Sequence, residues 1–369
     1  MRYRQIVALA IVTVFVAIAI TGCRDDVQTN WTPGDPIDAE RVKIGVIYID
    51  DGSGAWSLAH DQGLTAAMSE LGLREDQVMR KFNVPDADAE ITEFMISTAI
   101  AEGVNVLIAT SWGYMYICEE LAIEHPNVVF ASASGYKRND SNFTNYFGSI
   151  YEARYLAGIV AGLMTETGKI GYVAAQGINN SEVTTGLNAF AMGVESVNSE
   201  ARVYVSVTHS WFYPEGERKA AQHLIDEGCD IIAQHSDTVE PQLTAGNAGV
   251  WGIGYNVDMS VYAPDTVLTS VIWNWNVYYT FLLESIINGS FETTPFHSNM
   301  AGGLVDIAPL SRGLTRPDVE VAVSEARARI VNGDIRVFAG EFVTNDGRSE
   351  LSHMKGRLSP GSTGITEIS

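Results

Sequence analysis

Aromatic side chains follow several of the short apolar runs in this sequence, at five places where a strand-like run ends. Indole and phenol rings stack on planar molecules, and offset stacking contributes roughly 0.5–1.5 kcal/mol per pair beyond the burial of apolar area. A single ring in such a place can also simply seal a contact between two parts of a protein. The rings are Trp56, Trp112 with Tyr114, Tyr136, Trp211 with Phe212 and Tyr213, and Trp273 with Trp275. Together they favour a site that clamps a flat ring.

Polar side chains stand beside these rings and could fix the orientation of a bound ring. A carboxylate or amide oxygen accepts hydrogen bonds from ring N–H groups and exocyclic amines, and so distinguishes one heterocycle from another. Each polar residue could equally be a solvated loop residue or a helix cap. The polar candidates are Asp51, Ser111, Gln234, Asp237, Asn256 and Asp258, with Gly113 beside Trp112. The sequence therefore predicts a binding site for a small, flat, aromatic solute.

No catalytic or metal-binding motif accompanies these residues. The runs His209-Ser210 and His235-Ser236-Asp237 could spell a serine triad, but the G-x-S-x-G nucleophile elbow is absent. The seven histidines are scattered, without H-E-x-x-H or C-x-x-C. The dinucleotide and P-loop glycine patterns are missing too. We expect no catalytic residue, no metal and no cofactor, and a nucleoside-hydrolysing enzyme is the alternative that these motifs fail to support.

The elements that must position the candidate residues alternate along the chain as strand, loop and helix. Residues 42–49 read as a buried parallel strand, and after a Gly-rich turn apolar residues recur at helical spacing over 58–71. Further strands are expected near 104–109, 128–131, 169–173, 203–207, 230–234, 250–254 and 267–272, and helices near 89–102, 153–164, 182–197, 216–227 and 276–288. This pattern predicts an α/β fold with doubly wound parallel sheets, whose loops after the strands converge on one crevice.

Residues 1–22 read as the signal peptide of a bacterial lipoprotein. Arg2 and Arg4 precede an apolar run that ends in Ile20-Thr21-Gly22-Cys23. The run is shorter than the ~20 residues of a membrane-spanning helix, so a transmembrane anchor is the less favoured alternative. Lipid on Cys23 would anchor the mature protein, with the polar residues 23–40 as a tether. We expect an extracytoplasmic protein, lipid-anchored to a bacterial membrane in the periplasm or at the cell surface.

The mature chain is strongly acidic. Without Arg2 and Arg4, 21 basic residues stand against 45 acidic ones, a formal net charge of −24. Such a charge disfavours nucleic acid and anionic lipid as partners. Cys118 and Cys229 lie close to apolar, helix-like sequence, which favours buried free thiols over a disulfide.

Seven segments carry a resemblance to a known family. They are 47–49 (IYI) with 54–56 (GAW), 110–115 (TSWGYM), 133–137 (ASGYK), 151–158 (YEARYLAG), 210–212 (SWF), 234–237 (QHSD) and 303–305 (GLV). In order and spacing they resemble the basic membrane protein family of ABC-transporter substrate-binding lipoproteins, of the purine-binding type. The resemblance implies a type I periplasmic-binding-protein fold, with two lobes joined by three crossing strands and the ligand between them. It also implies an ABC transporter permease as partner, and we expect a monomer.

Carried over residue by residue, the resemblance implies that Trp56 and Trp211 stack on the ligand and that Asp258 faces it. Nucleoside receptors of the family follow the last crossing strand with a lysine that reaches the sugar, where this chain has Trp273. An indole offers one donor and a large apolar face instead of three donors and a charge. We therefore expect a purine base such as adenine, with a purine nucleoside or riboflavin as the alternatives. A surface lipoprotein without a small ligand is the alternative of another class.

The three crossings divide the chain into lobes. We place them near Tyr136, Ile272 and Asn299. Lobe I then takes residues 42–136 and 272–299, lobe II takes 137–271 and 300–345, and a polar tail takes 346–369. Hinge closure would bring the rings together on the solute and exclude water from its polar contacts.

Overall fold

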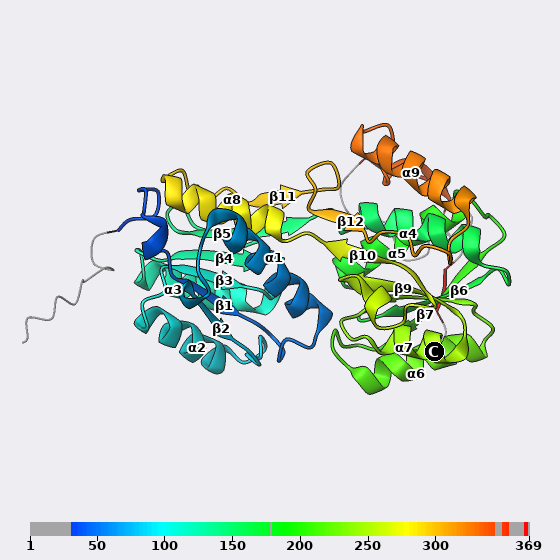
Figure 1. The fold of residues 1–369 in the computed structure, drawn as a ribbon, viewed down its shortest axis with the longest axis horizontal. Coiled ribbons are helices and arrows are strands. Elements are labelled where there is room, and N and C mark those ends of the chain that lie inside the picture. The colour runs from blue at the N-terminus through cyan, green and yellow to red at the C-terminus, as the bar shows by residue number, and fades with distance from the viewer. Residues whose placement is uncertain (1–30, 178, 344–348, 354–364, 368–369) are drawn as a thin grey trace, which may run out of the picture.

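Two parallel-dominated sheets, each covered by helices, form two lobes in the computed structural model (Figure 1). The structure describes residues 31–343 except 178, together with 349–353 and 365–367. The predicted signal peptide, Cys23 and residues 24–30 of the predicted tether lie outside this part of the chain. The rest of the predicted tether is not a free linker, because Trp31 and Ile37 are buried in the hydrophobic core. The architecture confirms the predicted α/β class.

Lobe I contains a six-stranded sheet in the order β11-β5-β4-β3-β1-β2, parallel at every pairing. Residues alternate between its two faces: Val46 of β1 packs in the core under α1 and α8, whereas Ile47 packs in the core over α2 and α3. The elements are β1 Ile44–Ile47, α1 Ala55–Leu71, β2 Val78–Lys81, α2 Ala89–Ala101, β3 Val106–Ala109, α3 Met115–Glu124, β4 Val129–Ala133, β5 Phe143–Gly148, α8 Asn276–Asn288 and β11 Phe296–Ser298. Helices on both faces explain why the central strands β1 and β3 are apolar throughout.

Lobe II contains a seven-stranded sheet in the order β12-β10-β9-β8-β6-β7-β15, with β12 antiparallel to β10. Its elements are α4 Ile150–Met164, β6 Lys169–Ala174, α5 Ser181–Glu195, β7 Arg202–Val207, α6 Pro214–Asp226, β8 Ile231–His235, α7 Glu240–Ala248, β9 Trp251–Asn256, β10 Val267–Trp273, β12 Val305–Ile307, α9 Pro317–Val331 and β15 Ile365–Glu367. Helices α4 and α5 cross closely at Gly158. A Cβ at this position would lie only 2.0 Å from the carbonyl oxygen of Phe190, so the crossing requires a glycine.

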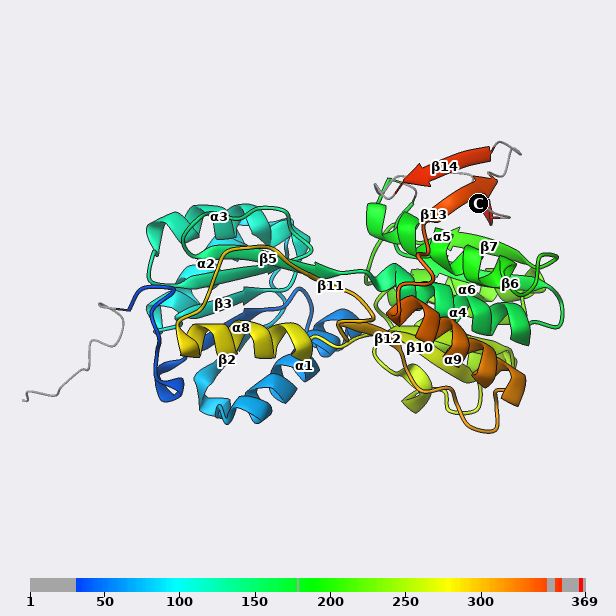
Figure 2. The same ribbon diagram turned by 90° about the horizontal axis from the view of Figure 1, so that it is seen from above.

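Three segments cross between the lobes, from β5 to α4, from β10 to α8 and from β11 to β12 (Figure 2). The second and third crossings lie within a few residues of their predicted places. The first does not: β5 pairs with β4 inside lobe I, so the chain crosses after Gly148 and not near Tyr136. Residues 137–148 therefore belong to lobe I, which corrects the predicted boundary.

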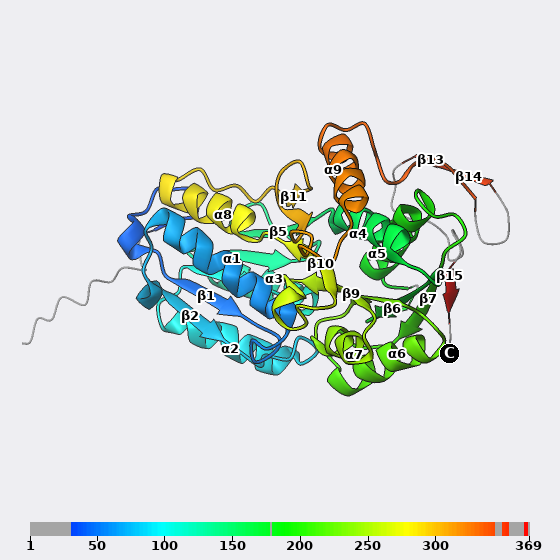
Figure 3. The same ribbon diagram turned by 45° about the vertical axis from the view of Figure 1, so that its right-hand side comes forward.

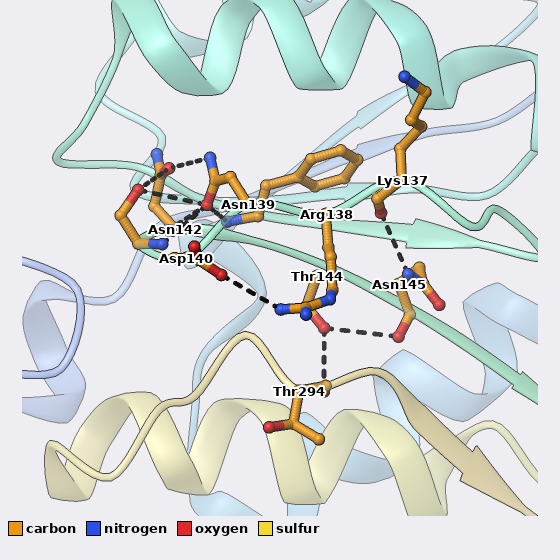
Figure 4. Close-up of polar contacts among 10 residues, drawn as sticks. Lys137, Arg138, Asn139, Asp140, Asn142, Thr144, Asn145 and Thr294 are labelled. Atoms are coloured by element: carbon orange, nitrogen blue, oxygen red, sulfur yellow. Dashed lines mark hydrogen bonds and ion pairs between the residues drawn. The ribbon is translucent and has the colours of Figure 1, made fainter.

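An asparagine-rich turn explains this difference. The side-chain oxygen of Asn139 accepts hydrogen bonds from the backbone N–H groups of Ser141, Asn142 and Phe143 at 2.8–3.0 Å (Figure 4). The side-chain amide of Asn142 donates to three backbone carbonyls, among them that of Ala122 in α3. These contacts fold the chain back onto lobe I, and β5 follows as one more parallel strand.

The carboxyl ends of the strands in the two sheets face the junction between the lobes (Figure 3). Within the predicted polar tail, β14 Ser349–His353 pairs with β13 Ala339–Val343, and β15 adds to the lobe II sheet beside β7. Cys118 and Cys229 are buried and free, as predicted. No helix among the described residues is long and apolar enough to cross a membrane.

Candidate functional site

Three rings stack in a column at the junction of the lobes. The planes of Trp273 and Trp275 lie 10° apart with centroids 4.5 Å apart, and those of Trp275 and His60 lie 12° apart with centroids 4.4 Å apart. Trp273 ends β10 in lobe II, whereas Trp275 directly precedes α8 and His60 lies in α1, both of lobe I. The column therefore joins the two lobes through ring contacts.

Trp56 stands nearly perpendicular to all three rings of this column. Its interplanar angles with His60, Trp275 and Trp273 are 79°, 84° and 87°, at centroid distances of 4.5, 5.6 and 6.0 Å. Its indole N–H donates to the carbonyl of Thr110 at the end of β3, at 2.6 Å. The half-buried indole is thus held at both its ring and its nitrogen, and the structure brings the predicted residues Trp56 and Trp273 together.

The loop that leads into α1, just before Trp56, is shaped by Asp50, which the sequence patterns did not single out. The Asp50 carboxylate accepts from the backbone N–H of Gly52 at 2.7 Å and from the hydroxyl of Ser57 at 2.8 Å. A Cβ on Gly54 would lie 2.3 Å from this carboxylate, so a larger residue there would displace the Asp50 side chain. The predicted residue Asp51, in contrast, is exposed and accepts from the N–H of Ser53.

Asp237 links this loop to the loop that carries Trp211. The backbone N–H of Ala55 donates across the lobes to the carbonyl of Asp237, and the N–H of Asp237 donates to the carbonyl of Trp211, both at 2.8 Å. The half-buried indole of Trp211 lies 5.7 Å from the ring of His235. Trp56, in the first turn of α1, and Trp211, in the loop after β7, therefore lie on neighbouring segments of opposite lobes.

A buried polar pair lies beside these rings. The side-chain amide of Asn256 donates to the carboxylate of Asp237 at 2.8 Å, and both residues are buried. Burial raises the pKa of Asp237 well above its usual range. The side-chain oxygen of Asn256 is buried without a hydrogen-bond partner among the described residues. Such an acceptor is costly to leave unpaired, and a donor on a bound solute could satisfy it.

Gln234 is buried inside lobe II, where its amide holds the loop after β8. It donates to the carbonyls of Ser236 and Thr238 at 2.9 and 2.7 Å and accepts from the amide of Gln242 at 2.9 Å. These contacts show that Gln234 supports the loop that carries Asp237.

Asp258 caps a short helical turn, Met259–Val261. Its exposed carboxylate accepts from the N–H of Ser260 at 2.9 Å. The structure does not bring it to the ring column, so a ligand contact by Asp258 stays a prediction.

Ser111 and Gly113 surround a carboxylate of lobe I. The Ser111 hydroxyl donates to the Asp86 carboxylate at 2.5 Å, and a Cβ on Gly113 would lie 2.5 Å from the carbonyl oxygen of Asp86. These contacts fix the loop after β3. They leave no evidence for direct ligand contacts by either residue.

Trp112 and Tyr136 lie at the surface of lobe I, 51% and 62% exposed. The ring of Trp112 meets Tyr116 edge-on, and the hydroxyls of Tyr136 and Tyr116 are 2.7 Å apart. No ring contact among the described residues joins them to the column. A ligand contact by Trp112 or Tyr136 therefore stays a prediction.

A second polar cluster, centred on Glu182, contacts the indole nitrogen of Trp273 through Tyr255. The Tyr255 hydroxyl donates to Glu182 at 2.9 Å, and the Nε2 atom of His235 lies 3.4 Å from the same carboxylate oxygen. The buried guanidinium of Arg154 lies 4.0 Å from the centroid of the Tyr255 ring. Glu182 lies at the start of α5, after β6. The expectation that residues following parallel strands gather at one crevice could have identified it, but it reads as an ordinary residue of the predicted helix.

Glu182 makes stability depend on pH. Burial raises its pKa to about 6, although the Tyr255 hydrogen bond and the Arg154 charge lower it, and its side chain is 19% exposed. A carboxyl with a raised pKa stabilises the fold below the pKa of the unfolded chain, and this contribution is lost as the pH rises through about 6. Between about pH 4 and pH 7 this effect should lower the unfolding free energy of the wild type by up to about 2 kcal/mol. Glu182→Gln cannot titrate at this position, so we expect the variant to lack that decrease.

Urea denaturation of wild type and variant across this pH range measures that difference. The unfolding free energy of the wild type should fall relative to that of Glu182→Gln as the pH rises through about 6. A difference between the two free energies that stays constant with pH would contradict the assignment.

Comparison with known proteins shows the family of this chain. A family model described as Bmp, ABC transporter substrate-binding protein PnrA-like, matches residues 44–300. The chain belongs to the Bmp family. As a Bmp-family protein it is a substrate-binding protein of an ABC transporter and not an enzyme, and it works outside the cytoplasm. No group of His, Cys, Asp or Glu side chains within the described residues could hold a metal ion.

Two curated relatives are similar over most of the Bmp-family chain. A purine-binding protein of Brucella abortus is 35% identical over 85% of this chain and 87% of its own length. A protein described as a putative ABC transporter glucose-binding protein, from Haloferax volcanii, is 36% identical over 85% of this chain and 78% of its own length.

Solved structures confirm the type I periplasmic-binding-protein fold. An ABC transporter solute-binding protein from Conexibacter woesei has a TM-score of 0.66 at 19% identity, covering 80% of this chain and 98% of that one. A transcriptional activator of the comK gene from Bacillus halodurans has a TM-score of 0.68 at 20% identity, covering 79% and 99%. At such identities the likeness shows the fold alone.

Proposed function

We propose that this Bmp-family protein captures a purine base, adenine-like, between its lobes and delivers it to an ABC transporter permease. One observation carries the proposal: Asp237 ties the start of α1, which carries Trp56, to the loop of Trp211 through two backbone hydrogen bonds. Its own carboxylate lies in the same loop, paired with Asn256. Two indoles and a carboxylate thus belong to neighbouring segments of opposite lobes.

The chemistry of a purine base matches these groups. Its ring offers two flat faces for indoles, and its N–H and amine donors suit the carboxylate of Asp237 and the unpaired oxygen of Asn256. The 35% identical relative from Brucella abortus, named as purine-binding, supports the same class of solute. A purine nucleoside and riboflavin remain the alternatives, since they carry similar rings.

The solute that accompanies the protein tests this proposal. Mass spectrometry of material released from freshly purified, denatured protein should show a purine base. Glucose in place of any purine would overturn the proposal in favour of the chemistry named for the Haloferax volcanii relative.

We also propose that lipid on Cys23 holds the protein at the membrane, because Cys23 ends a lipobox after a short apolar run. Cys23→Ser should move the protein from the membrane fraction to the soluble extracytoplasmic fraction. Fractionation followed by immunoblotting measures this, with Cys118→Ser as the matched control because Cys118 is buried in α3. Equal membrane retention of C23S and wild type would contradict the anchor.

A further inference from the structure

We propose that Glu182 and Tyr255 act as specificity-determining positioning residues, because they keep the only hydrogen-bond donor of the Trp273 side chain occupied inside lobe II. The Trp273 face of the site then offers apolar surface alone and rejects the hydroxyl groups of a sugar. This inference rests on the proposed function and deepens it.

A chain of hydrogen bonds runs from Trp273 to Glu182. The indole N–H of Trp273 donates to the Tyr255 hydroxyl at 3.3 Å, and that hydroxyl donates to Glu182 at 2.9 Å. Trp273 and Tyr255 are both buried. The three residues come from β10, β9 and the start of α5, so lobe II holds the chain by itself.

The chemistry of the two ends fixes the direction of this chain. An indole nitrogen can only donate, and an ionised carboxylate can only accept. The Tyr255 hydroxyl must therefore give its hydrogen to Glu182 and receive the hydrogen of Trp273 on its oxygen. If residue 182 donated instead, its hydrogen would compete with the indole N–H for the Tyr255 oxygen, and the hydrogen bond that occupies Trp273 would weaken.

Arg154 supports this arrangement from the other side of the Tyr255 ring. Its guanidinium lies 4.0 Å from the ring centroid and donates to the carbonyl of Gln234 at 2.6 Å. The positive charge favours the ionised form of Glu182 and attracts the face of the phenol ring. Nε and one terminal nitrogen of Arg154 have no hydrogen-bond partner among the described residues, so the guanidinium is not neutralised by direct pairing there.

Occupation of the Trp273 donor has a consequence for the solute. A sugar hydroxyl brought against this indole would lose its water and find no donor, whereas the flat face of a purine ring has no hydrogen bonds to lose there. We expect the wild-type protein to bind adenine at least ~10-fold more tightly than adenosine.

The test compares adenine with adenosine by calorimetry in wild type, Tyr255→Phe and Glu182→Gln. Tyr255→Phe keeps the ring and removes the acceptor, so the freed indole N–H becomes available to a sugar hydroxyl. The ratio of the adenosine Kd to the adenine Kd should fall at least ~5-fold, and Glu182→Gln should lower it in the same direction. Tyr204→Phe, at a half-buried tyrosine in β7, is the matched control and should leave the ratio unchanged.

The possible failures are distinguishable. A wild-type protein that binds neither compound would overturn the proposed function together with this inference. A wild-type protein that binds adenine, with the same ratio in Tyr255→Phe, would overturn this inference alone. Should either variant fail to fold, hydrogen exchange of the Trp273 indole N–H in the wild type decides: slow exchange supports the chain of hydrogen bonds, and exchange as fast as that of the exposed Trp112 overturns it.

Discussion

Trp56→Ala is expected to weaken the binding of a purine base at least ~30-fold, about 2 kcal/mol. The indole is already held in place, by its hydrogen bond to Thr110 and by its edge contacts with the ring column. A ring that is fixed before the solute arrives loses little conformational freedom on binding, so most of its stacking energy appears as affinity. Isothermal titration calorimetry with adenine measures the effect.

Trp251→Ala supplies the matched control for this prediction. Trp251 is also half-buried, but it begins β9, at the end of the strand that points away from the junction. Its loss should lower stability and leave adenine affinity within about twofold of wild type. If the two variants lose affinity equally, Trp56 acts through the stability of the fold and not through stacking.

Asp237→Asn is expected to weaken adenine binding ~10- to 100-fold, because hydrogen bonds to a charged group contribute roughly 1.5–3 kcal/mol. The raised pKa of this buried carboxyl adds a pH dependence. Only the ionised form accepts from two solute donors, so wild-type affinity should fall as the pH is lowered, and the asparagine variant should lose this dependence. Calorimetry at several pH values measures both effects.

The exposed Asp265, in the loop before β10, provides the control substitution Asp265→Asn. It removes the same charge far from the paired loops and should change neither affinity nor its pH dependence. If Asp237→Asn binds adenine as tightly as Asp265→Asn does, Asp237 has no part in recognising the solute.

The alternation of strands and helices could be predicted because several central strands are covered on both faces and are apolar throughout, as in β1 and β3. Strand β5 was missed because Phe143–Gly148 mixes polar and aromatic residues. The Asn139 turn before it resembles the start of a connection between lobes, and only the pairing with β4 shows that the chain has not yet crossed.

The meeting of Trp56 and Trp273 could also be predicted, since loops after parallel strands gather at one edge. Which ring in such a loop turns inward could not. Trp112 follows β3 even more closely than Trp56 follows β1, yet it is exposed, and its neighbour Ser111 turns to donate to Asp86.

Buried polar residues of the site were the hardest to predict from the sequence. His60 completes the ring column from the middle of α1, where its type and spacing resemble those of any helical residue. Burial lowers its pKa well below the usual range, so it is a neutral ring that stacks like an aromatic residue. Only the packing of α1 against Trp275 reveals this role.

The central claim is that the paired loops of Trp56 and Trp211 recognise a purine. Calorimetric titration of the purified protein with adenine, adenosine, riboflavin and glucose tests it most directly. The proposed site predicts that adenine binds most tightly and that glucose produces no heat of binding. Saturable binding of glucose with no response to any purine would contradict it.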